Sequence, residues 1–308
     1  MSEVCVVGSF MMDLSLRAPR RPGPGETVIG TEFSISPGGK GFNQAVAAAR
    51  CGVSTAMVGS LGDDDFGRTF RAAMAAEGID SRGVRTVAGV GTGVGVPLVE
   101  DDGQNSIVVV PRANHSMTVA DLAAAAAVIR SAKVLLLQME LPVDVVVEAA
   151  RLGRQSGAFV VLNPAPAVSG LAPFAGLVDC VVPNESEAGL LTGLSWDGEG
   201  PAAAVGSILV DSGAGAVVLT LGERGAYWSR PGHAGQVDAH PAECIDSVGA
   251  GDAFCGALAA RMAQGASLEE AVRFGNAAGA LAVTRAGAAP AMPTRQEIEA
   301  LLSEPSCR

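Results

Sequence analysis

Two carboxylates flank a glycine-rich turn near the C-terminal end of the chain, between Asp246 and Phe254. The segment reads Asp-Ser-Val-Gly-Ala-Gly-Asp-Ala-Phe and leads into an apolar helical pattern. Such a turn leaves backbone N–H groups free at the positive end of a helix dipole, where a phosphate or a developing oxyanion is stabilised. Asp252 can then act as a base that takes a proton as a phosphate approaches. An ordinary helix N-cap is an equally good interpretation of this segment taken alone.

A second polar loop, Gly38-Gly39-Lys40-Gly41, precedes Asn43 at the start of a predicted helix. The glycines allow close approach of a small polar ligand, and Lys40 and Asn43 offer donors that match hydroxyl groups. The spacing of a Walker A loop is absent. The alternative is a helix-entry turn with an exposed lysine.

Single carboxylates follow two predicted strands. Asp13 comes after the first strand, and Glu140 comes after the run 134–138. We predict that both lie at the C-terminal ends of central strands, where ligands bind in α/β sheets. Asp13 serves equally well as a turn or cap residue, whereas for Glu140 the sequence favours contact with a ligand hydroxyl.

Two further strand ends carry polar turns. Asn184 and Glu187 lie three residues apart and face the same side of a helical first turn, where they could serve Mg²⁺ through water or form a capping box. The turn from Thr220 to Gly225 could bind phosphate through its amides, although a hairpin turn is the stronger interpretation of it alone.

The elements that must position these residues alternate along the chain. Strands are predicted at Val4–Val7, Thr55–Val58, Val134–Gln138, Phe159–Leu162, Cys180–Val182 and Ala216–Leu221. Helices are predicted at Gly41–Arg50, Phe66–Glu77, Thr118–Ser131, Val143–Gly153, Ser186–Thr192, Ala202–Asp211, Gly251–Gln264, Leu268–Thr284 and Thr294–Leu302. Continuous apolar strands between helices indicate an α/β protein with a mainly parallel sheet covered on both faces. We expect residues 1–308 to form one domain.

Two segments break this alternation, at about residues 13–37 and 91–112, with a turn at Asp101-Asp102-Gly103 in the second. Their glycine- and proline-punctuated, alternating patterns predict antiparallel strands of a small β-sheet lid inserted over the strand ends. The exposed edges of such a lid could pair between two copies, so we expect a homodimer.

The amino-acid composition excludes some classes of binding partner and indicates a cellular compartment. The formal charge of −11 argues against nucleic acid and anionic membrane as main partners. The six scattered cysteines predict buried thiols in a reducing compartment, and the first residues predict a strand instead of a signal peptide. We therefore expect a cytoplasmic protein with no membrane helix.

Together these segments resemble the ribokinase-like, or phosphofructokinase-B type, carbohydrate kinases, and within them the ribokinase branch most. The two glycine-rich signatures carry the resemblance, with Ser247 where the family has threonine. Further segments match in order: Pro24-Gly25-Glu26-Thr27, Gln138-Met139-Glu140, Asn163-Pro164-Ala165-Pro166-Ala167, Pro183-Asn184-Glu185 and Val283-Thr284-Arg285. The resemblance implies a three-layer α/β/α fold with a β-sheet lid. It also implies transfer of the γ-phosphoryl of ATP to the primary hydroxyl of a pentose, D-ribose giving ribose 5-phosphate.

The resemblance also implies a role for each matching residue. Asp252 would be the base, beside an anion hole formed by the amides of Gly249, Ala250 and Gly251. The sugar would be held by Met11, Asp13, Gly39, Lys40, Asn43, Glu140 and Asp252. Asn184 and Glu187 would serve the phosphates and Mg²⁺, and the nucleotide would lie against Thr220, Gly222, Gly225, Gly251 and Asn276. A K⁺ ion would be held by Asp246, by carbonyls of Val248, Ala282, Arg285 and Gly287, and by a group near Ala291.

Four residues depart from the family pattern. Met11 stands where ribokinases have asparagine, Phe42 replaces a small residue, Arg112 replaces glycine, and Ala291 replaces a hydroxyl-bearing cation ligand. Because of the first three departures, phosphoryl acceptors other than ribose remain as alternatives. These are a hexose such as fructose, a sugar acid such as 2-keto-3-deoxygluconate contacted by Arg112, or a nucleoside. A non-catalytic sugar- or nucleotide-binding protein is disfavoured because Asp252 and the anion-hole glycines are retained.

Overall fold

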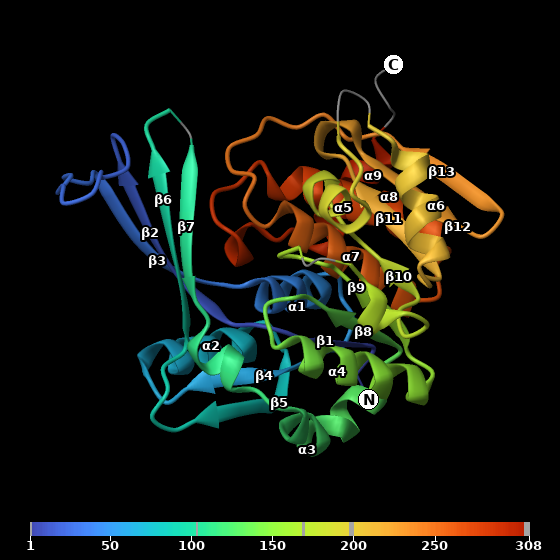
Figure 1. Ribbon diagram of the computed structural model, residues 1–308, viewed down its shortest axis with the longest axis horizontal. Helices are drawn as coiled ribbons and strands as arrows, with labels where there is room; N and C mark the ends of the chain where they lie inside the picture. Colours follow the sequence, from blue (N-terminus) through green and yellow to red (C-terminus); the bar gives the residue numbers. More distant parts are fainter. Residues whose placement is uncertain (1, 103, 168–169, 197–199, 305–308) are drawn as a thin grey trace.

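A nine-stranded sheet forms the centre of the computed structural model, which describes residues 2–102, 104–167, 170–196 and 200–304 (Figure 1). Its order is β13-β12-β11-β10-β9-β8-β1-β4-β5. The strands from β5 to β11 in this order are parallel, and β12 pairs antiparallel with both β11 and β13. Their bounds are β1 Val4–Val7, β4 Thr55–Gly62, β5 Asp80–Val87, β8 Val134–Leu137, β9 Phe159–Leu162, β10 Cys180–Val181, β11 Ala216–Thr220, β12 Ala226–Arg230 and β13 His233–Val237.

Helices cover both faces of this sheet because its central strands are apolar on both sides. In β1, Val4 and Val6 belong to one buried cluster, whereas Cys5 and Val7 belong to the other. The first cluster packs under α1 Lys40–Arg50, α2 Asp65–Ala76, α7 Ala250–Ala263, α8 Leu268–Ala282 and α9 Arg295–Ser303. The second packs under α3 Val119–Arg130, α4 Val143–Ser156, α5 Glu185–Thr192 and α6 Ala202–Asp211. The predicted three-layer α/β/α fold is confirmed.

A separate four-stranded sheet projects from one side of this body (Figure 1). Its order is β3-β2-β6-β7, with bounds β2 Met11–Ala18, β3 Glu32–Gly38, β6 Gly93–Glu100 and β7 Asn105–Val110. We call it the small sheet. Its strands come from the two segments that break the alternation, and Gly103 of the predicted turn lies outside the described residues.

The structure corrects three details of the small sheet. The strands β2 and β6 pair parallel, whereas the other two pairings are antiparallel as predicted. Asp13 lies inside β2 and not at the C-terminal end of β1, because the chain enters the small sheet at Met11. The predicted strand character of residues 26–31 is also wrong, since β3 begins only at Glu32. Prolines and glycines at positions 22–25 and 30 interrupt the pairing before that point.

Edge strands of the large sheet are missing from the prediction. The strand β5 reads Asp-Ser-Arg-Gly-Val-Arg-Thr-Val and is mostly half-buried, and β13 is largely exposed. Strands at an edge are not buried on both faces, so they lack the continuous apolar run that marks the central strands.

The cysteines agree only in part with the expectation of buried thiols. Cys5, Cys51, Cys180 and Cys255 are buried and free, but Cys244 is exposed in the loop before α7. Cys307 lies outside the described residues. In the part of the chain that the structure describes, we find no helix with the length and apolar character needed to cross a membrane.

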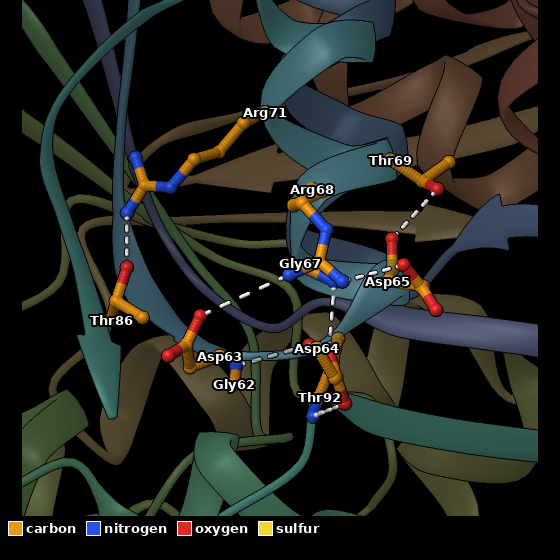
Figure 2. A network of polar contacts seen from close by, with 10 residues as sticks. All are labelled: Gly62, Asp63, Asp64, Asp65, Gly67, Arg68, Thr69, Arg71, Thr86 and Thr92. Atoms are coloured by element: carbon orange, nitrogen blue, oxygen red, sulfur yellow. Dashed lines mark hydrogen bonds and ion pairs between the residues drawn. The ribbon is translucent and has the colours of Figure 1, made fainter. Parts of the chain in front are cut away.

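A polar network fixes the small sheet to the body where β6 begins (Figure 2). Asp64 caps α2 by accepting the Gly67 amide at 2.9 Å, and it also accepts the Thr92 amide at 2.8 Å and the Thr92 hydroxyl at 2.6 Å. The Gly62 amide donates to the same hydroxyl at 3.0 Å. One carboxylate therefore joins the end of β4, the start of α2 and the base of the small sheet.

Candidate active site

The carboxylate of Asp252 is held by two side-chain amides from the first turn of α1. Asn43 Nδ2 donates to Oδ2 at 2.9 Å, and Gln44 Nε2 donates to Oδ1 at 2.9 Å. Asp252 is 7% exposed. The N-cap of α7 is Gly249, and no side chain caps this helix. The helix-cap interpretation of Asp252 is therefore wrong, and its carboxylate is instead fixed in a buried position.

A chain of buried amides orients Gln44. Gln138 Nε2 donates to Gln44 Oε1 at 2.6 Å, and Gln44 Nε2 donates to Asn163 Oδ1 at 3.1 Å as well as to Asp252. Asn163 Nδ2 donates in turn to the Val182 carbonyl at 2.9 Å. The sequence analysis assigned no role to Gln44. Gln44 is completely buried in the amphipathic helix α1, which its place in the sequence alone does not show.

The glycine-rich turn before α7 has the backbone that an anion hole needs. Gly249 adopts φ 81°, and a Cβ added there would lie 3.1 Å from the Ala288 Cα, so only glycine fits without strain. A Cβ added at Gly251 would have none of the described atoms within 4 Å, leaving room for a ligand to approach that backbone. The Ala250 amide donates to the Ser247 carbonyl at 3.3 Å, a long contact.

One pocket lies against this turn and collects the residues predicted for phosphate transfer. Its lining includes Lys40, Asn184, Glu187, Thr220, Gly249, Gly251 and Asp252. It also includes residues that the sequence analysis did not assign to a site: Asn163, Ala165, Val182, Ser247 and Cys255. Residues that are more than 200 positions apart therefore share one cavity.

Asp13 faces this site from the small sheet. Side chains at Gly38 and Gly95, on the two strands that pair with β2, would collide with its two carboxylate oxygens. Burial raises the pKa of Asp13 to about 7, and the charges of Glu140 and Asp252 add to the rise. The small sheet thus brings the carboxylate of Asp13 close to those of Glu140 and Asp252.

Glu140 is held where the loop after β8 meets the start of α1. Ser9 Oγ donates to Glu140 Oε2, and the Lys40 amide donates to the same oxygen at 3.0 Å. Burial raises the pKa of Glu140, although Lys40 and Ser9 oppose the rise. Both contacts fall on Oε2, so they position the carboxylate without using Oε1.

Lys40 balances this negative charge. Burial lowers the pKa of its ammonium, but the attraction of the surrounding carboxylates outweighs that effect and holds the pKa above its ordinary value. The contributing carboxylates are Asp252, Glu140 and Glu187. The interpretation of Lys40 as an exposed lysine in a helix-entry turn is therefore wrong.

Asn184 and Glu187 form the capping box that the sequence allowed. Asn184 Oδ1 accepts the Glu187 amide at 2.8 Å, and Glu187 Oε2 accepts the Asn184 amide at 2.9 Å. Burial raises the pKa of Glu187, an effect that the Asn184 amide and Lys40 oppose. Both residues also line the pocket, so capping presents their side chains to it.

Of the residues predicted to contact the nucleotide, Asn184, Thr220 and Gly251 line this pocket. Thr220 pairs with Asn184 in an isolated bridge, and the turn that follows it forms the predicted hairpin between β11 and β12. In that turn, Gly222 and Gly225 have φ values of 55° and 83°. A side chain at Gly225 would collide with the backbone at residues 237–239, and Asn276 Nδ2 donates to the Asp238 carbonyl at 2.7 Å. These contacts place Gly225 and Asn276 beside one loop.

Asp246 joins two of the loops predicted to hold K⁺. Its Oδ1 accepts the Val248 amide at 3.0 Å, and its Oδ2 accepts the Gly287 amide at 2.9 Å. The Arg285 amide donates to the Ala282 carbonyl at 3.2 Å, and its guanidinium pairs with Glu297 at 2.5 Å. Ala291 is buried nearby in a short 3₁₀ helix. The carboxylate and neighbouring carbonyl oxygens are the ligand type that a hard cation prefers.

Only one of the three departures in the predicted sugar pocket remains beside it. Phe42 packs into the core against Phe70, with ring centroids 5.0 Å apart in an edge-to-face arrangement. Arg112 donates to the Thr92 carbonyl at 3.0 Å and lies 4.0 Å from Asp64, at the base of the small sheet. Met11 lies two residues from Asp13 on the same face of β2.

Comparison with known proteins defines the class. The family model described as "pfkB family carbohydrate kinase" matches residues 1–295 of the chain. The chain is 39% identical over 292 residues to the ribokinase of Haemophilus influenzae, covering 95% of each chain. It is 33% identical over 302 residues to the deoxyribokinase of Salmonella typhi, covering 98% of this chain and 99% of that protein. The structure of Arabidopsis thaliana ribokinase complexed with ribose and ATP matches with a TM-score of 0.91 at 32% identity, covering 99% of each chain.

The chain therefore belongs to the pfkB family of carbohydrate kinases. It is a sugar kinase, as the two glycine-rich signatures predicted.

We predict that Gln44→Leu lowers kcat by about 10- to 100-fold, because Asp252 loses one of the donors that orient it. The KM for ATP should stay nearly unchanged, since Gln44 does not line the pocket that reaches Thr220. Steady-state kinetics with a sugar acceptor measures both constants. The matched control is Gln236→Leu in the exposed strand β13, which should behave as the wild type. A kcat of Gln44→Leu equal to that of the control would contradict the positioning role.

Proposed function

We propose that the chain transfers the γ-phosphoryl group of ATP to the primary hydroxyl of a pentose, with D-ribose as an acceptor. The observation that supports this most is the fixed, buried carboxylate of Asp252 beside the open backbone of Gly251. Relatives named for ribose and for deoxyribose, and the related structure that contains ribose and ATP, support a pentose and a nucleoside triphosphate as substrates.

The proposed mechanism needs a base, an anion hole and a held sugar. Asp252 takes the proton of the primary hydroxyl. As it does so, the hydroxyl oxygen bonds to the γ-phosphorus and the bond from this phosphorus to the leaving ADP oxygen breaks. Amides of Gly249, Ala250 and Gly251 stabilise the charge on the transferring group. Asp13, Gly39, Lys40, Asn43 and Glu140 hold the sugar hydroxyls on the other side of Asp252. Asn184, Thr220, Gly222, Gly225 and Asn276 line the nucleotide site.

The sugar-acid alternative receives no support from the contacts of Arg112. Its guanidinium is occupied by the Thr92 carbonyl and lies beside Asp64. The carboxylates that face the site would also repel an acidic sugar, since the charges of Glu140 and Asp252 already raise the pKa of Asp13.

We also propose Mg²⁺ and K⁺ as cofactors. Glu187 is a pocket-facing carboxylate suited to Mg²⁺ through water, and the ion would neutralise phosphate charge when bound. Among the described residues no three His, Cys, Asp or Glu side chains are grouped as metal ligands, which fits an ion held largely by the nucleotide and water. Asp246 and nearby carbonyls would hold K⁺, which fixes the turn at Gly249.

We propose further that two copies associate through the small sheet in the cytoplasm. Several large apolar side chains of the sheet are exposed, among them Phe33 at 62% and Val108 at 65%. Apolar surface of this kind is commonly covered by a partner, and the edge strands β3 and β7 remain able to pair. Sedimentation velocity of the purified chain measures its stoichiometry.

The proposed base is tested with Asp252→Asn. We expect turnover of D-ribose to fall by at least about 100-fold, because asparagine cannot accept the proton. ATP binding by calorimetry should be nearly unchanged. Asp211→Asn, at the exposed end of α6, is the matched control and should keep wild-type activity. Full activity of Asp252→Asn would exclude Asp252 as the base.

The proposed K⁺ site is tested by replacing K⁺ with a large organic cation at constant ionic strength. We expect the rate with D-ribose to fall, because the turn at Gly249 loses the ion that fixes it and raises its positive potential. Asp246→Asn should weaken the dependence on K⁺ concentration. A rate that is indifferent to the replacement would count against the site.

A further inference from the structure

We infer that two buried amide residues, Asn163 and Gln138, are positioning residues for the proposed base. They fix the direction of the Gln44 amide, so that Gln44 always presents a donor to the carboxylate of Asp252. Together with Gln44 they form what we call the amide network. The inference rests on the proposed kinase function, in which Asp252 takes a proton from the acceptor hydroxyl.

The amide network is anchored at the ends of three neighbouring parallel strands. Gln138 follows the last residue of β8, Asn163 follows that of β9 and Val182 follows that of β10. These strands lie side by side in the large sheet, and all three residues are buried. Gln44, on α1, bonds to both Gln138 and Asn163. The end of the sheet therefore presents a row of polar groups to one side of α1.

A backbone carbonyl sets the direction of these hydrogen bonds. The Val182 carbonyl can only accept, so Asn163 turns its Nδ2 toward it, at 2.9 Å. Asn163 Oδ1 then faces Gln44 and accepts from its Nε2 at 3.1 Å. The same Nε2 donates to Asp252 Oδ1 at 2.9 Å. A reversed Gln44 amide would set its oxygen against two acceptor oxygens at once, which is unfavourable.

Gln138 holds the other end of the Gln44 amide. Its Nε2 donates to Gln44 Oε1 at 2.6 Å. Its own Oε1 is buried and has no partner among the described residues. An unpaired buried oxygen is unfavourable, so the contact with Gln44 outweighs this cost. The Gln44 amide is therefore held from both sides in the direction that gives Asp252 a donor.

This direction matters for a carboxylate that has to accept a proton. Asn43 donates to one oxygen of Asp252 and Gln44 donates to the other. Donors on both oxygens stabilise the ionised carboxylate, which is the form that acts as a base. A reversed Gln44 amide would present an oxygen instead, and this oxygen would favour the protonated carboxyl and release its fixed orientation.

The experiment compares the pH profile of kcat for the wild type and for Gln138→Glu, with D-ribose as the acceptor. Burial raises the pKa of an introduced carboxyl, so at low pH this group is protonated and donates to Gln44 as the amide does. Once ionised it can only accept, and it draws the Gln44 donor away from Asp252. We expect kcat of the variant to fall by about tenfold or more between about pH 6 and about pH 9, relative to the wild type. The KM for ATP should stay nearly constant.

Two control variants separate the charge from the loss of the amide. Gln138→Leu removes the donor without adding a charge, so we expect kcat to be lower by about threefold to tenfold with a profile parallel to that of the wild type. Gln155→Glu makes the same amide-to-carboxyl change at an exposed position of α4 and should match the wild type.

The groups that already titrate around Asp252 respond to an added charge in a different way. From the elements packed around this carboxylate they are Asp13, Lys40, Glu140, Glu187 and Cys255. A negative charge that acts on them only through space would raise the pKa of each one. The whole profile would then move to higher pH, whereas reversal of the Gln44 amide removes activity at high pH.

A Gln138→Glu profile parallel to that of the wild type, or a fall at high pH that Gln138→Leu shares, overturns the inference. If Gln138→Glu does not fold, Asn163→Asp tests the network from the Val182 end. The introduced carboxyl donates to that carbonyl only while protonated, so the same fall at high pH is expected. If the wild type phosphorylates another sugar and not D-ribose, the proposed acceptor fails, and the same comparison with that sugar decides the inference. If D-ribose is phosphorylated and the profiles are parallel, only the inference fails.

Discussion

The candidate active site depends on holding several buried or half-buried carboxylates around one ammonium group. Asp13, Glu140 and Asp252 come from the small sheet, the loop after β8 and the start of α7, and each would destabilise the others if left unbalanced. Lys40 supplies the opposing charge, and specific donors hold two of the carboxylates. The arrangement exists only when the small sheet, α1 and α7 meet, so it couples the site to the whole fold.

The donors divide the carboxylates by task. The carboxylate of Asp252 accepts hydrogen bonds from two side-chain amides. These bonds fix its orientation next to the turn at Gly249. Glu140 is held through one oxygen only, and Asp13 lies between glycines that leave room around it. The proposed base is therefore rigidly oriented, while the groups proposed to bind sugar keep acceptor capacity for hydroxyls. Met11 lies two positions before Asp13 on the same face of β2, and its thioether offers no hydrogen bond as strong as those of the carboxylates.

The central strands and their helices could be predicted because burial on both faces leaves continuous apolar runs, as in Val4–Val7 and Phe159–Leu162. The edge strands β5 and β13 could not, because one side of each is not buried in the sheet. At the site, residues at strand ends and in glycine-rich turns were identifiable from chemistry and resemblance. Gln44 was not, because its role arises from Gln138, Asn163 and Asp252, which no spacing in the sequence relates to it. The direction of Phe42 likewise depends on Phe70, which the sequence places 28 residues away.

The raised pKa of Asp13 makes the stability of the folded chain depend on pH. Because the pKa of Asp13 is raised from 3.8 to about 7, the folded chain binds a proton more tightly than the unfolded chain between these values. The contribution of this carboxyl to stability is therefore present at low pH and is lost as the pH rises through about 7.

The most direct measurement is the titration of the Asp13 carboxyl carbon by NMR, with Asp13→Asn used for assignment. A midpoint near pH 7, which moves down in Glu140→Gln as one like charge is removed, is the result that the account predicts. A midpoint near the ordinary value of 3.8, or one that ignores Glu140→Gln, would contradict it.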